Sequence, residues 1–189
     1  MTKPSSLWQR PTARWRLGLP IGALLMVVIG VLATVGFNGV MQATSSNEFC
    51  SSCHGPAAFA AEEWPQHTHF TSASGVKVQC ADCHVSKQFL PKMWRKVQGM
   101  KEVYHYAVGT YDSREKFELH RLDMAKKVWA EMKATDSATC RSCHNYQRMD
   151  FTKQSAKAQL WHPSIAEKGL TCIDCHKYLA HDRVATELQ

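Results

Sequence analysis

Four Cys-x-x-Cys-His motifs, an uncharged apolar stretch near the N-terminus and two segments of helical periodicity predict an all-α protein. A single N-terminal transmembrane helix is expected first. The rest is expected to form one helical domain built from two repeated halves, packed around bound groups in place of a conventional apolar core. No long β-type alternation is found in the 189 residues.

The transmembrane helix is expected over residues 17–40. No charged side chain occurs between Leu17 and Asn47, and about 20 apolar helical residues cross a hydrocarbon layer of about 30 Å. Residues 1–16 carry only basic charges, so the positive-inside rule places them in the cytoplasm and residues 41–189 on the other side. A cleaved signal peptide is the alternative, but its apolar region is usually only about 7–15 residues long. The length therefore favours an uncleaved, single-pass anchor in a bacterial inner membrane.

All eight cysteines belong to the four motifs, and a histidine directly follows each pair. The cysteines are Cys50, Cys53, Cys80, Cys83, Cys140, Cys143, Cys172 and Cys175. The histidines are His54, His84, His144 and His176. In this motif two thiols reach the two vinyl groups of one porphyrin, and the histidine can ligate the iron. Disulfides or zinc sites need no histidine after every pair. The pattern predicts four covalently attached c-type haems with these histidines as proximal ligands, and the motif class implies a periplasmic domain.

The formal net charge of +7 does not indicate a nucleic-acid partner. Four haems add about eight negative propionates, offset by about four positive charges when the irons are ferric. The loaded protein is then only mildly basic when oxidised and close to neutral when reduced. No basic run interleaved with aromatic residues stands out as a nucleic-acid surface.

The motifs repeat in two halves, expected over about 48–90 and 138–182. The first pair begins at Cys50 and Cys80, and the second at Cys140 and Cys172. This pattern suggests an internal duplication with two haems in each half. The connector, 91–137, is expected to contain two helices, near 91–108 and 114–133, separated at Gly109. The first has apolar residues at helical spacing, at Trp94, Val97, Met100, Tyr104 and Ala107.

Three of the six other histidines are candidate distal ligands. His69 and His162 lie between the motifs of their halves in equivalent positions, and His181 follows the last motif. His120 is a weaker alternative, either a ligand or a packed histidine. Three distal ligands for four haems leave one haem different. The first motif directly follows the apolar segment, so its haem is expected to have an open or weakly held sixth position and to accept electrons from a lipid-soluble donor.

Several segments resemble one known family beyond the haem motif itself. They are SGVKVQCADCHV from Ser74, LPKMWRKV from Leu90, KFELHRLDMA from Lys116, ATCRSCHNYQRMD from Ala138 and GLTCIDCHKYLAH from Gly169. The chain resembles the NapC/NirT/NrfH tetrahaem quinol dehydrogenases, and is most similar to the NapC and NirT branch. The resemblance implies electron transfer from membrane quinol to a periplasmic reductase or its cytochrome subunit, with nitrate reductase favoured. The chain would then be an electron-transfer subunit that feeds a separate terminal reductase.

The resemblance also implies particular site residues. His69, His162 and His181 occupy distal-ligand positions, and Asp82 and Lys96 match positions linked to the quinol pocket. A carboxylate there could accept a quinol proton and a lysine could polarise the quinol oxygen. The ordinary alternatives are a solvated loop carboxylate and a surface charge on a helix.

One departure concerns the first haem. Some members have a methionine two residues after the first motif histidine, where this chain has Pro56. Proline cannot ligate iron, so His54 is the expected ligand, with Met93 as a distant reserve. An open haem also leaves two other functions: a membrane-tethered haem sensor for a diatomic ligand, or a terminal reductase acting at that haem.

Overall fold

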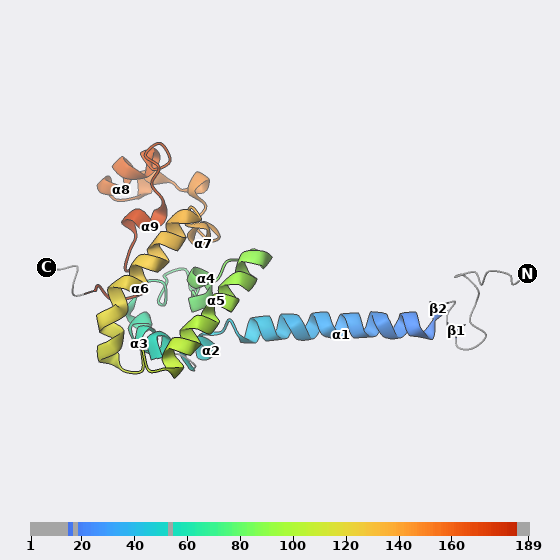
Figure 1. The fold of residues 1–189 in the computed structure, drawn as a ribbon. Coiled ribbons are helices and arrows are strands. Elements are labelled where there is room, and N and C mark those ends of the chain that lie inside the picture. The colour runs from blue at the N-terminus through green and yellow to red at the C-terminus, as the bar shows by residue number, and fades with distance from the viewer. Residues whose placement is uncertain (1–14, 17–18, 53–54, 185–189) are drawn as a thin grey trace, which may run out of the picture. The chain divides into compact units, whose positions relative to one another are not determined.

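The structure is a computed structural model that describes residues 15–16, 19–52 and 55–184 and divides into two units, residues 1–44 and 45–189 (Figure 1). In the first unit, β1 (Trp15–Arg16) and β2 (Leu19–Pro20) form a two-residue antiparallel pair with Trp15 opposite Pro20. The helix α1 (Ile21–Ala43) follows. This short strand pair is a small exception to the all-helical prediction.

The apolar helix lies slightly further along the chain than the expected 17–40. Leu19 precedes a proline, and a residue in that position is disfavoured in the helical region, so the helix begins only after Pro20. At the other end it continues to Ala43, and the Thr44 hydroxyl donates to the carbonyl of Val40 at 2.7 Å. Gly22–Ala43 has a mean hydropathy of 2.2 and is not buried within the protein. It is long and apolar enough to cross a membrane.

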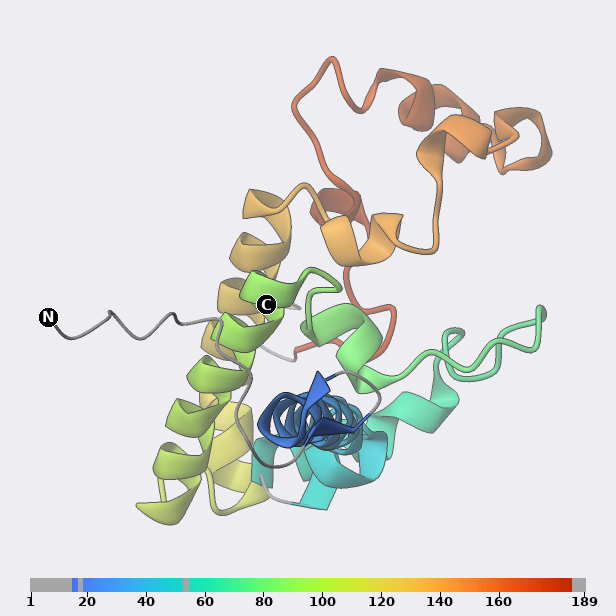
Figure 2. The same ribbon diagram turned by 90° about the vertical axis from the view of Figure 1, so that its right-hand side faces the viewer.

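The second unit consists of helices joined by turns and loops, and no strand occurs in residues 45–52 and 55–184. Its α-helices are α2 (Asn47–Ser52), α3 (Gly55–Glu63), α4 (Cys80–His84), α5 (Phe89–Ala107), α6 (Arg114–Ala134), α7 (Ala138–Arg141), α8 (Ala156–Trp161) and α9 (Cys172–Cys175). Short 3-10 turns are η1 (Trp64–Gln66), η2 (Tyr146–Arg148), η3 (Phe151–Lys153) and η4 (His162–Ser164). Figure 2 shows the long helices α5 and α6 beside a second region of short helices and loops.

The two long helices occupy the stretch where helices were expected. Gly109 has a φ of 75°, a left-handed conformation that favours glycine, and it follows the end of α5. The amide of Thr110 then donates to the carbonyl of His105 at 2.8 Å. The Ser113 hydroxyl accepts from the amide of Lys116 and caps α6. Glycine and serine therefore fix the turn between the helices.

The apolar core of the second unit is small. The hydrophobic side chains buried among the described residues are Trp64, Phe117, Ile173 and Val184. So few buried apolar side chains are not enough to stabilise a unit of this size by themselves. Other interactions must therefore hold the short helices together.

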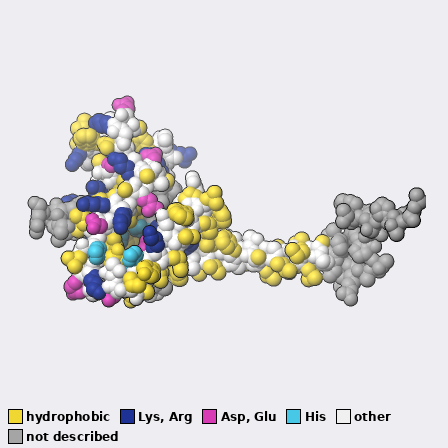
Figure 3. Space-filling model, in the orientation of Figure 1, with side chains coloured by type: hydrophobic (Ala, Val, Ile, Leu, Met, Phe, Trp, Pro, Cys, Tyr) yellow, Lys and Arg dark blue, Asp and Glu magenta, His cyan; other side chains and the backbone are white. Residues whose placement is uncertain are grey.

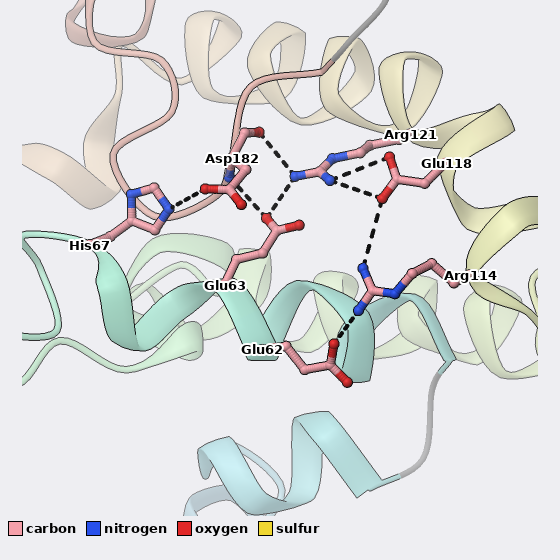
Figure 4. Close-up of polar contacts among 7 residues, drawn as sticks. All are labelled: Glu62, Glu63, His67, Arg114, Glu118, Arg121 and Asp182. Atoms are coloured by element: carbon pink, nitrogen blue, oxygen red, sulfur yellow. Dashed lines mark hydrogen bonds and ion pairs between the residues drawn. The ribbon is translucent and has the colours of Figure 1, made fainter.

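One such interaction is a buried polar cluster, shown in Figure 4. Glu63, at the end of α3, is 7% exposed, and its carboxylate accepts from Arg121 of α6 at 2.6 Å and from the amide of Asp182 at 2.9 Å. Arg121 also donates to the carbonyl of Asp182 at 2.9 Å. Burial opposes the charge of Arg121, but Glu63 and Glu118 outweigh it and raise the pKa of the guanidinium. The cluster thus fastens the C-terminal segment to α3 and α6.

Breaking this cluster should cost far more than breaking its exposed neighbour. Substituting Glu63→Ala leaves the guanidinium of Arg121 without its buried partner, which typically costs about 3–5 kcal/mol. Glu62, next in the chain, pairs with Arg114 at the surface, and Glu62→Ala should cost below about 1 kcal/mol. Urea unfolding followed by circular dichroism checks the difference. Equal losses of stability in the two variants would contradict the buried role of Glu63.

Candidate functional site

Three motif histidines each face one histidine from outside the motifs. The ring centroids are 6.2 Å apart for His69 and His144. They are 6.1 Å apart for His84 and His181, and 6.0 Å apart for His162 and His176. The structure thus brings together the three non-motif histidines expected as distal ligands, each with a different motif histidine.

This separation fits a metal ion held between two imidazoles. Rings that ligate one metal from opposite sides, through bonds of about 2 Å, have centres about 6 Å apart. One of the non-motif histidines, His69, also has a buried Nδ1 atom without a hydrogen-bond partner. A buried polar atom in a native fold normally has a partner, so His69 suits a site that holds a further group. The donor set and the neighbouring Cys-x-x-Cys pairs fit a covalently attached haem iron.

Burial keeps the ring pair at α4 neutral, which is the form that can bind a metal. His84 is half-buried, and its desolvation, helped by His181 and Arg95, lowers its pKa to about 4. Burial also lowers the pKa of His181. His181 directly precedes Asp182, so the cluster of Glu63 and Arg121 fixes the segment that delivers its ring.

His162 is held by groups from its own half. Its Nδ1 atom lies 2.5 Å from Oε1 of Gln154, and the Tyr146 hydroxyl donates to its backbone carbonyl. The Phe151 ring lies 5.9 Å from the imidazole. Because an amide oxygen only accepts, Nδ1 is the donor and Nε2 is left to bind a metal.

The second and fourth motifs begin with the same local structure. In α4 the carboxylate of Asp82 accepts from the amide of Gln79 at 2.9 Å. In α9 the carboxylate of Asp174 accepts from the amide of Thr171 at 2.8 Å. Each is a capping box in which the residue before the first cysteine receives the N3 amide in return. The aspartate within each motif therefore has a structural role in starting a very short helix.

Successive motifs are neighbours in space. The amide of Cys80 donates to the side chain of Asn47 in α2 at 2.9 Å, which joins the first motif to the second. Burial, and then the nearby Cys140, raise the pKa of Cys83 to about 11, which places the second motif beside the third. The amide of Ile173 donates to the buried Ser137 hydroxyl at 3.2 Å, which joins the fourth to the third. The motifs thus follow one another in chain order.

The halves of the sequence are not separate in space. His69 belongs to the first half and faces a motif histidine of the second, whereas His181 belongs to the second half and faces His84 of the first. Of these three pairs among the described residues, that of His162 and His176 alone lies within one half. The duplicated sequence pattern therefore builds one unit whose halves exchange histidines.

The residues expected at a quinol pocket lie near the first two motifs. Burial opposes the charge of Asp82, but hydrogen bonds from Lys87 and from the Gln79 amide outweigh it and lower its pKa. Lys96 lies in α5 close to Cys50, and burial lowers the pKa of its ammonium. The nearest ion-pair partner of Asp82 is Lys87, a residue that sequence reasoning did not select.

The remaining histidines have other neighbours. His67 lies 3.3 Å from the Asp182 carboxylate, and His105 lies 3.5 Å from the Thr110 hydroxyl. His120 is exposed and contacts the ring of Tyr111 at 5.4 Å. Among residues 55–184 no fourth pair joins a motif histidine to another histidine. Cys53 and His54 of the first motif lie outside the described residues.

Comparison with known proteins agrees with this geometry. The model of the NapC/NirT cytochrome c family, N-terminal region, matches residues 13–186. The protein named "Cytochrome c-type protein NapC" of Haemophilus influenzae is 43% identical over 174 residues, 92% of this chain and 85% of that protein. The "Denitrification system component NirT" of Stutzerimonas stutzeri is 40% identical over 177 residues, 93% of this chain and 87% of that protein.

A longer relative matches only in part. The "Cytochrome c-type protein TorY" of Haemophilus influenzae is 42% identical over 142 residues, which are 75% of this chain and 38% of that protein. No solved structure gives a significant match. The family model and the near full-length relatives show that the chain belongs to the NapC/NirT cytochrome c family, in which c-type haem is bound covalently.

Proposed function

We propose that this chain is a membrane-anchored tetrahaem quinol dehydrogenase that passes electrons to a periplasmic reductase. The observation that carries the proposal is the set of three histidine pairs with ring centres 6.0–6.2 Å apart. When bound, the haems supply the one-electron redox chemistry. The protein supplies the ligands, their spacing and a separate place for quinol.

In this proposal each motif holds one haem through its two cysteines, and the paired histidines hold three of the irons. His84 and His181 hold the iron of the second motif, His144 and His69 the third, and His176 and His162 the fourth. His54 is the proximal ligand of the first, whose sixth position stays open or weakly held. The neighbouring positions of consecutive motifs support a relay in chain order from the first motif to the fourth.

The first motif is the proposed entry point for electrons. Only residues 44–46 separate α1 from α2, which contains Cys50. A lipid-soluble quinol that reaches the membrane surface would therefore meet the first motif before the others. The basic N-terminus supports a cytoplasmic start and a haem domain in the periplasm.

Asp82 and Lys96 are the proposed quinol-binding residues. Asp82 is only partly buried. Lys96 lies close to Cys50 of the first motif. In this proposal the carboxylate of Asp82 accepts from a quinol hydroxyl, and the ammonium of Lys96 donates to a quinol oxygen. The capping role of Asp82 is compatible with this, since one oxygen caps α4 and the other pairs with Lys87.

A periplasmic nitrate reductase, or its cytochrome subunit, is the favoured electron acceptor. Several of the relatives with near full-length matches carry the name NapC. The relatives named NirT and TorY match at similar identity, so another periplasmic reductase is the alternative acceptor. Reduction of purified candidate reductases by the quinol-reduced protein would identify it.

The ligand assignment predicts the spin states of the irons. Electron paramagnetic resonance of the oxidised protein should show three low-spin haems, because two imidazoles ligate each iron, and one high-spin haem. His69→Ala should convert one low-spin signal to high spin. The matched control is His120→Ala, since His120 is exposed and contacts Tyr111, and it should leave all four signals unchanged. Four low-spin signals in the unsubstituted protein would contradict the open first haem.

The hydrogen bond from His162 to Gln154 predicts a tunable potential at one haem. Gln154→Glu strengthens the acceptor on Nδ1 and makes the imidazole a stronger donor to the iron, so one midpoint potential should fall. Gln154→Leu removes the acceptor and should raise the same potential. The exposed Gln147, in the same region, provides the control variant Gln147→Leu. Spectropotentiometric titration measures all four potentials, and an unchanged titration in both Gln154 variants would show that this contact does not reach the iron.

Asp82 and Asp174 cap their helices in the same way, and Asp82 alone is proposed at the quinol site. Comparing the two residues therefore separates quinol binding from capping. Asparagine still accepts from the capped amide, so Asp82→Asn and Asp174→Asn should both keep their helices. Asp82→Asn should slow haem reduction by quinol about 100-fold, the usual size of a lost general base. Asp174→Asn should leave it unchanged, because Asp174 belongs to the fourth motif. Stopped-flow reduction by a menaquinol analogue measures both rates, and equal slowing would mean that the aspartates act only as caps.

A further inference from the structure

Helix α5 exposes a long apolar stripe. Its outward positions follow a spacing of three and four residues: Leu90, Trp94, Val97, Lys101, Tyr104 and Val108. Leu90 is 75% exposed and Trp94 is 64% exposed. Figure 3 shows hydrophobic side chains gathered over this helix. Eighteen residues of helix give the stripe a length of about 27 Å, and contiguous apolar surface of this size usually marks a contact with a partner or a membrane.

The opposite side of α5 carries the cations. Lys92, Arg95 and Lys96 are half-buried. Arg95 lies close enough to His84 to lower its pKa, and Lys96 lies close to Cys50. This side of the helix therefore faces the first two motifs. The haems proposed at these motifs would attach on this side of α5, and the apolar stripe lies on the other side.

The stripe has the composition of a helix at a membrane surface. Trp94 and Tyr104 are the aromatic types enriched at the boundary between lipid and water. Lys101 is the one charge in the stripe, and it suits anionic phospholipid headgroups. The single acid of the helix, Glu102, is paired with Arg95 at 3.0 Å. Apolar side chains, interfacial aromatics and a cation without an acid favour lipid over a protein partner.

We propose that the stripe of α5 lies in the surface of the membrane that α1 crosses. This inference rests on the anchor proposed above, and not on the quinol chemistry. Three residues between α1 and α2 span at most about 11 Å, so the second unit stays close to the membrane. An amphipathic helix at the surface buries its apolar side about 5–10 Å into the boundary of headgroups and acyl chains. The stripe then becomes a second point of attachment, which fixes the orientation of the haem domain.

Photolabelling from the lipid tests this placement. The full-length holoprotein is placed as single copies in nanodiscs of phosphatidylcholine and phosphatidylglycerol, with a trace of phosphatidylcholine that carries a diazirine on its acyl chain. After illumination, peptide mass spectrometry maps the labelled residues. The expected result is label in α1 and on the outward side of α5, at least about tenfold above the label in α8, whose exposed Leu160 serves as the background.

Matched variants test whether the apolar stripe causes the labelling. Leu90→Glu with Val97→Glu should lower the α5 label about tenfold or more, because acids are costly within a membrane. Leu119→Glu with Leu160→Glu changes two exposed apolar residues outside α5 and should leave the α5 label unchanged. Unaltered haem content and Soret spectra establish that each variant is folded. If the glutamates disturb folding, Val97→Gln replaces them, with a smaller loss of label expected.

Three results would overturn the inference in distinguishable ways. Label in α1 without label in α5 would mean that the anchor is correct and that the stripe does not meet lipid. No label in either helix would mean that the proposed anchor itself fails. Cross-links from α5 to a second copy, at higher protein density and without lipid label, would assign the stripe to a protein contact.

Discussion

The proposed haem ligation sets one geometrical requirement, which is that two imidazole rings lie on opposite sides of each metal ion. The ring centres must then lie about 6 Å apart, because metal–nitrogen bonds of about 2 Å cannot stretch far. The pair of His84 and His181 joins α4 to the C-terminal segment, and the pair of His69 and His144 joins opposite halves of the sequence. With a small apolar core, the fold is organised by the positions of these rings.

Polar contacts of the second unit hold these histidine rings in position. Glu63 and Arg121 bind the backbone around Asp182 and so fix the residue beside it, His181. Gln154 acts on the ring of His162 directly and selects the nitrogen that is left free. Polar side chains hold a direction better than apolar ones, because a hydrogen bond weakens when its angle changes, whereas an apolar contact is not directional. A cofactor protein with few buried apolar residues therefore places its ligands through such contacts.

Much of this site could be predicted from the sequence, but its pairing could not. The motif spacing identified the cysteines, and repetition singled out His69 and His162, because both are local patterns. Which histidine faces which motif depends on contacts between distant segments, and the repeated pattern does not specify those contacts. The cap formed by Asp82 was missed although Asp174 repeats it, since a five-residue helix has no periodicity to detect. The short strand at Leu19 was also missed. A residue before proline favours extended backbone, and the apolar character of this stretch predicts a helix instead.

Helix α5 shows why apolar periodicity predicts a helix more reliably than it predicts what the helix contacts. Trp94, Val97 and Tyr104 follow the expected helical spacing, and that spacing usually marks the side packed against a core. Here the same side is exposed, and the cations Arg95 and Lys96 face the motifs instead. Apolar periodicity indicates only that the two sides of a helix have different surroundings. In a chain with an apolar anchor and bound haems, lipid can take the place of the core, and the acidic propionates of haem can take the place of water.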